Sequence, residues 1–171
     1  MDASKPTVDD GAADFEAALN SDDKLELRLW LRLLTCSNLI EAEVRRRLRR
    51  DFDTTLPRFD VLAQLERNGN DMTMGELSRR MMVSNGNITG LVDRLVTEGL
   101  VRRDNRPEDR RTVRVRLTAK GRNSFRRMTP RHEIWIDELL SGLDRQDKQQ
   151  LYELLGRLKT STADARKDEP A

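Results

Sequence analysis

Two stretches in the middle of the chain carry side chains suited to contacting a polyanion and the edges of bases. Residues 102–116 hold seven arginines against three acids, around a single proline. Residues 84–94 place asparagine, serine, threonine and arginine between apolar residues at helical spacing. Asparagine pairs bidentately with adenine and arginine with guanine, whereas threonine contacts a thymine methyl group or a phosphate. These residue types predict binding to double-stranded DNA.

The polar residues in the second stretch are those that a helix exposes while its apolar side packs inward. They are Ser84, Asn85, Asn87, Thr89 and Arg94. The first two are explained equally well by turn and helix-cap chemistry, which both residue types favour. The others lie beyond a cap and are the stronger candidates for base readout, and Gly86 and Gly90 allow the backbone to come close to DNA.

The arginine-rich stretch predicts a hairpin with a basic tip. Arg106, Arg110 and Arg111 near this tip are predicted to enter a minor groove, where narrow A·T segments concentrate negative potential. Asp109 is repelled by phosphate, so we expect it to hold a neighbouring arginine in place by a charge-assisted hydrogen bond. The alternative is a solvated loop with no binding role.

Local signals predict the elements that position these residues. Thr73-Met74-Gly75-Glu76 matches a capping box and starts a short helix. After a turn at residues 83–86, a further helix runs until Gly99 stops it. Residues 100–103 and 112–117 are two strand-like runs, the second with strict alternation. A helix-turn-helix followed by a hairpin is the predicted centre of the protein.

Longer helices are expected on both sides of this centre. A cap at residues 21–23 opens a long helix that ends near Arg50, and Pro57 suits the first turn of the next helix, which ends at residues 68–70. Thr118 caps a further helix, which Pro130 is expected to kink or break, and Asp144 opens the last one. The flanking helices are apolar over more surface than one partner buries, which predicts a homodimer.

The composition fits this organisation: 36% of the 171 residues are charged and 4% are aromatic, which favours solvated helices and a mainly α fold with a small β-hairpin wing. The predicted segments are an acidic disordered tail (1–21), a dimerisation helix (22–50), a winged helix-turn-helix lobe (51–117), C-terminal dimerisation helices (118–160) and a disordered tail (161–171).

Several classes of protein are disfavoured. No window suggests a membrane span or an export signal, so we expect a cytoplasmic protein with no membrane partner. One cysteine and one histidine do not make an ordinary zinc site, and no catalytic or phosphate-loop motif is present, so we expect no enzyme, metal or cofactor.

The series of short motifs between residues 74 and 121 resembles that of the MarR family of winged helix-turn-helix regulators. The resemblance rests on residues 74–78, 88–95, 98–101, 106–111 and 117–121, in order and at the family spacing, while the flanking helices fit the family over roughly residues 22 to 160. It implies an obligate homodimer that binds a pseudo-palindromic operator. It also implies repression of nearby genes that ends when a small, often phenolic or aromatic, effector binds between the dimer helices and the DNA-binding lobe.

Residues 81–87 are similar to a branch that controls degradation of aromatic acids and senses hydroxycinnamoyl-CoA thioesters. The position of the family pocket implies ligand contacts at Trp30, Leu34, Asn38 and Phe59, although core packing is the interpretation that we favour for the two aromatic residues. If the effector is a CoA thioester, arginines of the basic run at 45–50, Arg46 among them, are candidates to meet its phosphates. The expected effector is an aromatic acid or its CoA thioester.

Two alternatives stay open at this point. Cys36 lies on the first helix, where one branch of the family senses oxidants, although a buried structural cysteine is the interpretation we favour because that branch surrounds its thiol with tyrosines and this chain has one tyrosine. An architectural DNA-binding protein without ligand control would use the same arginines on phosphates with little sequence preference.

Overall fold

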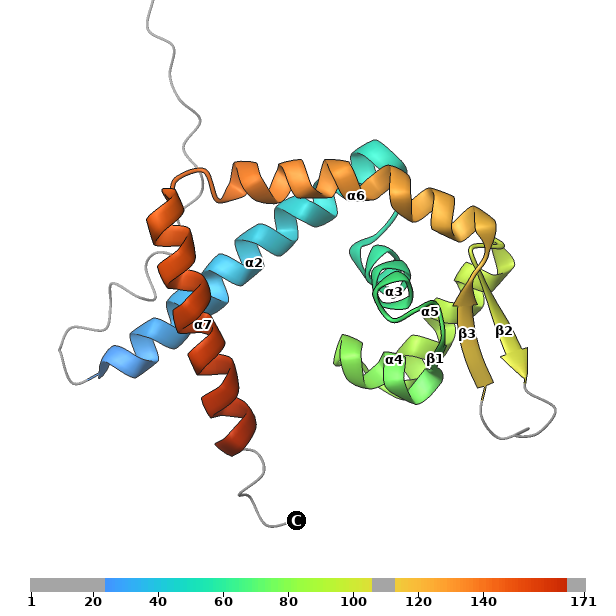
Figure 1. The fold of residues 1–171 in the computed structure, drawn as a ribbon, viewed down its shortest axis with the longest axis horizontal. Helices are drawn as coiled ribbons and strands as arrows, with labels where there is room; N and C mark the ends of the chain where they lie inside the picture. Colours follow the sequence, from blue (N-terminus) through green and yellow to red (C-terminus); the bar gives the residue numbers. More distant parts are fainter. Residues whose placement is uncertain (1–23, 106–112, 166–171) are drawn as a thin grey trace, which may run out of the picture. The chain divides into compact units, whose positions relative to one another are not determined.

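The computed structural model describes residues 24–105 and 113–165, where the chain is mainly helical with one small sheet (Figure 1). The chain divides into two units, residues 1–122 and 123–171. The first contains α2 (Leu25–Phe52), α3 (Leu56–Arg67), β1 (Met72–Thr73), α4 (Met74–Met81), α5 (Asn85–Thr97), β2 (Val101–Asn105) and β3 (Val113–Leu117). α6 (Ala119–Leu139) lies mostly in the second, together with α7 (Arg145–Ala165).

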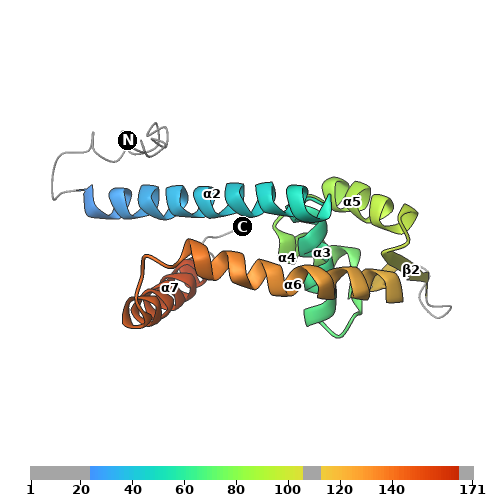
Figure 2. The ribbon, with the colours of Figure 1, turned by 90° about the horizontal axis from the view of Figure 1, so that it is seen from above.

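α2 is one continuous helix (Figure 2) that ends slightly later than the sequence indicated. It reaches Phe52 because Asp53 adopts a left-handed backbone, φ 48°, and its N–H returns to the carbonyl of Arg49. The cap expected at residues 21–23 lies outside the described residues. α3 carries Pro57 in its first turn, as predicted, and gives way to a turn in which Gly69 and Asn70 have positive φ.

The sheet has three antiparallel strands in the order β1-β3-β2. β2 and β3 form the predicted hairpin, with Val101 opposite Leu117 and Asn105 opposite Val113. β1 adds two residues to the outer edge of β3, with Met72 opposite Val115. The sequence did not indicate β1, because two residues cannot show a period of two.

The C-terminal helices differ from expectation in two places. α6 runs without a break from Ala119 to Leu139, with Pro130 inside it. A break at Pro130 was therefore wrong, and a kink at this residue, which the missing N–H and the proline ring favour, stays a prediction. α7 continues to Ala165, so residues 161–165 are helical where a disordered tail was expected, and the Thr162 hydroxyl donates to the carbonyl of Leu158 at 2.9 Å. Within the described ranges, no helix combines the length and the apolarity that a bilayer span requires.

The core of the first unit is built from one side of each of its helices and from the strands. Its buried apolar residues include Leu48, Phe59, Val61, Leu62, Leu65, Met72, Leu77, Ile88, Val92, Leu95, Val101, Val115 and Leu117. Thus α3, α4, α5 and the sheet share one apolar interior, which fixes the orientation of the helix-turn-helix. In the second unit Met128 and Trp135 of α6 are buried, and α7 has no buried residue.

Candidate nucleic-acid interface

The first helix of the helix-turn-helix is fixed at its N-terminus by the predicted capping box. The Thr73 hydroxyl accepts the Glu76 N–H at 3.2 Å, and the Glu76 carboxylate accepts the Thr73 N–H at 2.7 Å. These hydrogen bonds, the backbone one first, lower the pKa of Glu76 below its ordinary value. The carboxylate therefore stays charged at neutral pH, where it also favours the helix N-terminus.

The turn between α4 and α5 is held by side-chain and backbone bonds from one serine. The Ser78 hydroxyl donates to the carbonyl of Val83 at 2.6 Å, and the Val83 N–H donates to the carbonyl of Ser78 at 3.2 Å. Met82 between them has a left-handed backbone, φ 53°, and is 92% exposed. A tight turn of this kind sets the angle at which α5 leaves α4.

α5 presents the predicted residues on its solvent side. Ile88, Val92 and Leu95 are fully buried. The exposed residues of the same helix and its cap include Ser84, Asn85, Asn87, Thr89 and Arg94. All five polar residues predicted for this helix are therefore accessible to a partner on α5 and its cap.

Two of these side chains already make local bonds. The Ser84 hydroxyl accepts the Asn87 N–H at 3.3 Å, which confirms Ser84 as the helix cap but leaves its own proton able to donate to a phosphate. The Thr89 hydroxyl donates to the carbonyl of Asn85 at 2.8 Å. The methyl group and lone pairs of Thr89 remain for a partner.

The two glycines of α5 lie on the open side of the helix. A Cβ added at Gly86 or at Gly90 would meet no atom within 4 Å. Asn87, Gly90 and Arg94 are three and then four residues apart, so they lie along one face. A glycine inside a helix costs about 1 kcal/mol relative to alanine. No atom of the described chain fills the space beside either glycine, so the helix backbone is accessible to a partner there.

Ion pairs hold α5 at its C-terminal half, and sequence reasoning missed them. Arg58 of α3 pairs with Glu98, which follows α5, and Lys120 Nζ donates to the carbonyl of Glu98 at 2.7 Å. Arg103 of β2 lies 2.6 Å from Asp93 of α5. The partners are too far apart in the sequence for helical spacing to reveal them, and they come together because α3 and β2 pack against α5.

The predicted tip of the wing falls between β2 and β3 in the sequence. Arg106, Arg110 and Arg111, with the supporting Asp109, lie outside the described residues. The strands that lead to them, β2 and β3, are paired with each other, and β2 packs against α5.

The basic run at the end of α2 is paired rather than simply solvated. Arg46 donates to both carboxylate oxygens of Glu43, at 2.7 and 2.6 Å, and Arg47 donates to one of them at 2.6 Å. These bonds, that from Arg46 first, lower the pKa of Glu43 to about 2. Arg45 pairs with Glu41 in the same way. The spacings of three and four residues were visible in the sequence and could have revealed these pairs.

The nominated ligand contacts fall into two groups. Trp30, Leu34 and Asn38 are exposed and lie at spacings of four along one side of α2, with Trp30 57% exposed. Core packing is therefore wrong for Trp30 within the described chain. Phe59 is 6% exposed, so core packing is confirmed for that residue. A small cavity of about 150 Å³ between α2 and α3 is lined by Arg45, Arg49, Thr55, Leu56 and Pro57, none of which was nominated.

Cys36 is exposed, which contradicts the buried structural cysteine that we favoured. The buried residues of α2 are Val44 and Leu48, both in its C-terminal half, and Cys36 precedes them by two turns. Thiol sensing at this position stays a prediction. Among the described residues, no three histidine, cysteine or acidic side chains are grouped so that they could hold a metal.

Known proteins are similar to this chain in sequence. The MarR family model matches residues 54–113. YfiV, an uncharacterized HTH-type transcriptional regulator of Bacillus subtilis, is 30% identical over 90% of this chain and 92% of its own. The transcriptional activatory protein BadR of Rhodopseudomonas palustris is 31% identical over 86% of this chain and 82% of its own.

Solved structures agree with the sequence relatives. A mutant form of MarR from E. coli, in complex with operator DNA, has a TM-score of 0.71 and 25% identity, and the match covers 81% of this chain and 99% of that one. The capping box, the turn, α5 and β2 lie within the residues that the family model matches. The chain belongs to the MarR family of winged helix-turn-helix transcriptional regulators, and is not an enzyme.

Proposed function

We propose that this protein is a homodimeric repressor of aromatic-acid catabolic genes. In this proposal it binds a pseudo-palindromic operator and leaves it when an aromatic acid or its CoA thioester binds. The DNA contacts are Ser84, Asn85, Asn87, Thr89 and Arg94 of α5 and its cap, with Arg106, Arg110 and Arg111 of the wing.

The exposed face of α5 that carries Asn87, Gly90 and Arg94 is the observation that supports DNA binding best. Asn87 and Arg94 flank Gly90 on a side of the helix that nothing in the described chain covers. Asparagine and arginine two turns apart on one face can both reach base edges in a major groove, and the glycine lets the helix backbone lie close to the sugar-phosphate chain. A structurally similar E. coli protein was solved in complex with operator DNA, which supports DNA binding by this fold.

Uncovered apolar side chains support the homodimer. α2 exposes Leu25, Leu29, Trp30 and Leu39, and α7 exposes Tyr152, Leu154 and Leu158, among others. Contiguous apolar residues on long helices mark surfaces that a partner covers. A second copy of the chain also supplies a second α5, which a two-fold symmetric operator requires.

An aromatic effector is supported by the side of α2 that carries Trp30, Leu34 and Asn38. An exposed indole, an aliphatic side chain and an amide at spacings of four suit a ring with one polar substituent. Arg46, later on α2, is exposed but bonded to Glu43, so a CoA phosphate must compete with that carboxylate.

The test is fluorescence anisotropy of labelled DNA from upstream of the protein's own gene, with excess unlabelled competitor. Aromatic acids, their CoA thioesters and free CoA are added in turn. We expect one thioester or acid, and not free CoA, to release the specific complex. Specific binding that no such compound disturbs would refute the effector, and binding without sequence preference would refute the operator. BadR is named an activatory protein, so a transcription assay with the same DNA decides between repression and activation.

Two variants test the α5 face. Asn87→Ala should weaken specific binding by about 1–3 kcal/mol, the range for a lost bidentate base contact. Gly90→Ala should stabilise the fold by up to about 1 kcal/mol while it weakens DNA binding, because the added methyl group meets DNA and not protein. Asn123→Ala, at an exposed position of α6, is the control. Unchanged DNA affinity in both α5 variants would contradict the proposed interface.

A further inference from the structure

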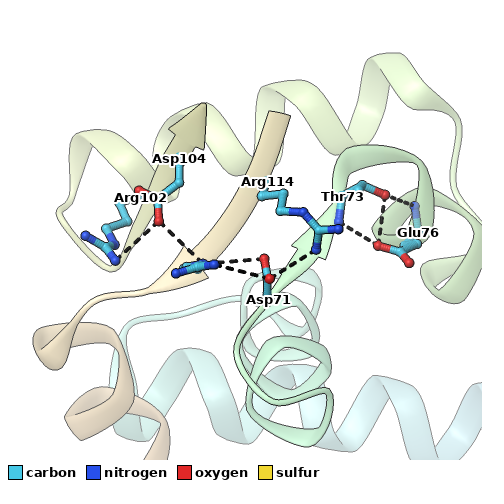
Figure 3. Close-up of polar contacts among 7 residues, drawn as sticks. Asp71, Thr73, Glu76, Arg102, Asp104 and Arg114 are labelled. Atoms are coloured by element: carbon cyan, nitrogen blue, oxygen red, sulfur yellow. Dashed lines mark hydrogen bonds and ion pairs between the residues drawn. The ribbon is translucent and has the colours of Figure 1, made fainter. Parts of the chain in front are cut away.

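An alternating row of charged side chains crosses the polar face of the sheet (Figure 3). Asp71 Oδ2 lies 3.1 Å from Arg114 Nη1 and 3.2 Å from Arg116 Nη2. Asp104 Oδ2 lies 3.4 Å from Arg116 Nε and 3.2 Å from Arg102 Nη2. The order is Arg102, Asp104, Arg116, Asp71, Arg114, and we call these five residues the wing charge row.

The register of the hairpin explains why the row needs its carboxylates. Arg102 of β2 is directly opposite Arg116 of β3, and Arg114 follows on the same face of β3. Like charges opposite each other destabilise a strand pair. Asp104 lies between Arg102 and Arg116, and Asp71 lies between Arg116 and Arg114, so each carboxylate serves two guanidinium groups.

Asp71 differs from the other four because it does not belong to the hairpin. It immediately precedes β1, and the chain then enters α4 through the capping box at Thr73. Its neighbour Asn70 bonds both backbone groups of Leu117, accepting from the N–H and donating to the carbonyl at 3.3 Å. Residues 70 and 71 therefore connect β3 to the start of the helix-turn-helix, and Asp71 makes the charged part of that connection.

The ionisation state of Asp71 agrees with this role. Burial acts to raise the pKa of Asp71, but hydrogen bonds from Arg116 and Arg114 outweigh it and lower the pKa below its ordinary value. The side chain is about one quarter exposed, at 27%. It is charged at neutral pH, and the ion pairs persist under the conditions in which DNA is bound.

We propose that Asp71 is a positioning residue for operator recognition. By holding Arg114 and Arg116 it fixes the wing strands against α4, and through α4 it fixes the separation between the wing and the exposed face of α5. Two DNA-binding elements held at a fixed separation act as one ligand, whereas elements that move independently lose that gain in effective concentration. The inference rests on the proposed function, because it assigns Asp71 a part in the same interface.

The test compares Asp71→Asn with Asp71→Glu and with Asp53→Asn. The first removes the charge at nearly constant shape, and the second keeps the charge. Asp53→Asn makes the same change of net charge at an exposed position with a left-handed backbone, which asparagine tolerates. Two duplexes are used at 25 °C: one that the wild-type protein selects from random-sequence DNA, and a scrambled duplex of the same composition. Thermal unfolding is recorded for every variant.

We expect Asp71→Asn to raise the Kd for the selected duplex about tenfold while the Kd for the scrambled duplex stays constant or falls. Removing a negative charge strengthens non-specific binding to phosphates. A change of charge alone would therefore lower the Kd for the selected duplex, whereas loss of positioning raises it. Asp53→Asn should show that charge effect only, and Asp71→Glu should recover part of the lost affinity.

Three results would overturn the inference. One is an unchanged Kd for the selected duplex with a lowered unfolding temperature, which would assign Asp71 to stability only. Another is equal weakening on both duplexes. If the wild-type protein selects no sequence at all, the proposed function fails and the positioning role falls with it.

Discussion

Asp60 is a carboxylate that the fold keeps in unfavourable surroundings, so replacing it with asparagine should stabilise the protein at and above neutral pH. Burial raises the pKa of Asp60 from 3.8 to about 6, Glu41 adds to the rise, and Arg45 and Arg67 oppose it. It lies half-buried on α3, and no described residue donates a hydrogen bond to it. The folded chain therefore favours the neutral form of Asp60.

The magnitude follows from the two pKa values. One pKa unit corresponds to about 1.36 kcal/mol, so a rise from 3.8 to about 6 sets an upper bound of about 3 kcal/mol. Water reaches part of the side chain, so we expect a gain of about 1–2 kcal/mol for Asp60→Asn at about pH 8.

The sign of the pKa shift of Asp60 determines how the stability gained by Asp60→Asn changes with pH. A group whose pKa is raised by folding contributes stability that is fully present below the unfolded pKa, about 3.9 for aspartate, and that is lost as the pH rises through the folded pKa. For Asp60 the loss is centred between the two values, 3.8 and about 6. The advantage of Asp60→Asn should therefore be absent below about pH 4 and complete above about pH 7.

Urea unfolding at one fixed protein concentration, followed by far-UV circular dichroism at several pH values, measures this difference. Asp53→Asn serves as the control, because Asp53 is exposed and its left-handed backbone accepts asparagine. A gain that does not vary with pH, or a loss of stability at about pH 8, would refute the reasoning.

Two further predictions concern other contacts of the first unit. A Cβ at Gly121 would overlap the carbonyl oxygen of Leu100, so Gly121→Ala should lower the free energy of unfolding by about 2 kcal/mol or more. Gly75→Ala, where the added carbon meets nothing within 4 Å, should not destabilise, and urea unfolding compares the two. The pKa of Glu43 is lowered to about 2, so its stabilisation is present above about pH 4.3 and is lost as the pH falls through about 2. Glu43→Gln should thus cost up to about 1 kcal/mol at neutral pH, and a cost that does not shrink towards about pH 3 would contradict the pairing.

The parts of the fold that the sequence predicted are those whose signals are local. The capping box at Thr73 and Glu76, the proline in the first turn of α3 and the glycine after α5 each act within four residues, so spacing alone identifies them. The exposed face of α5 followed from the period of its buried residues.

The parts that the sequence did not predict depend on contacts between distant residues. β1 exists because β3 offers it an edge. The partners of Asp71 lie more than 40 residues away, and those of Glu98 lie on α3 and α6, so no local pattern carries these pairs. The carboxylate partners of Arg45 and Arg46 could have been predicted, because they lie four and three residues away on the same helix.

Because α7 has no buried residue, the free energy of folding of the whole molecule must be measured with association in mind. A helix of 21 residues that buries no side chain within its own chain gains little from packing, and isolated helices in water are only marginally stable. Its free energy of folding then depends on what covers it from outside. With a second copy as the cover, folding and association become one equilibrium, in which the unfolding midpoint rises with protein concentration. Dilution would act on this protein as a denaturant, and melting α7 would mark the point at which two chains separate.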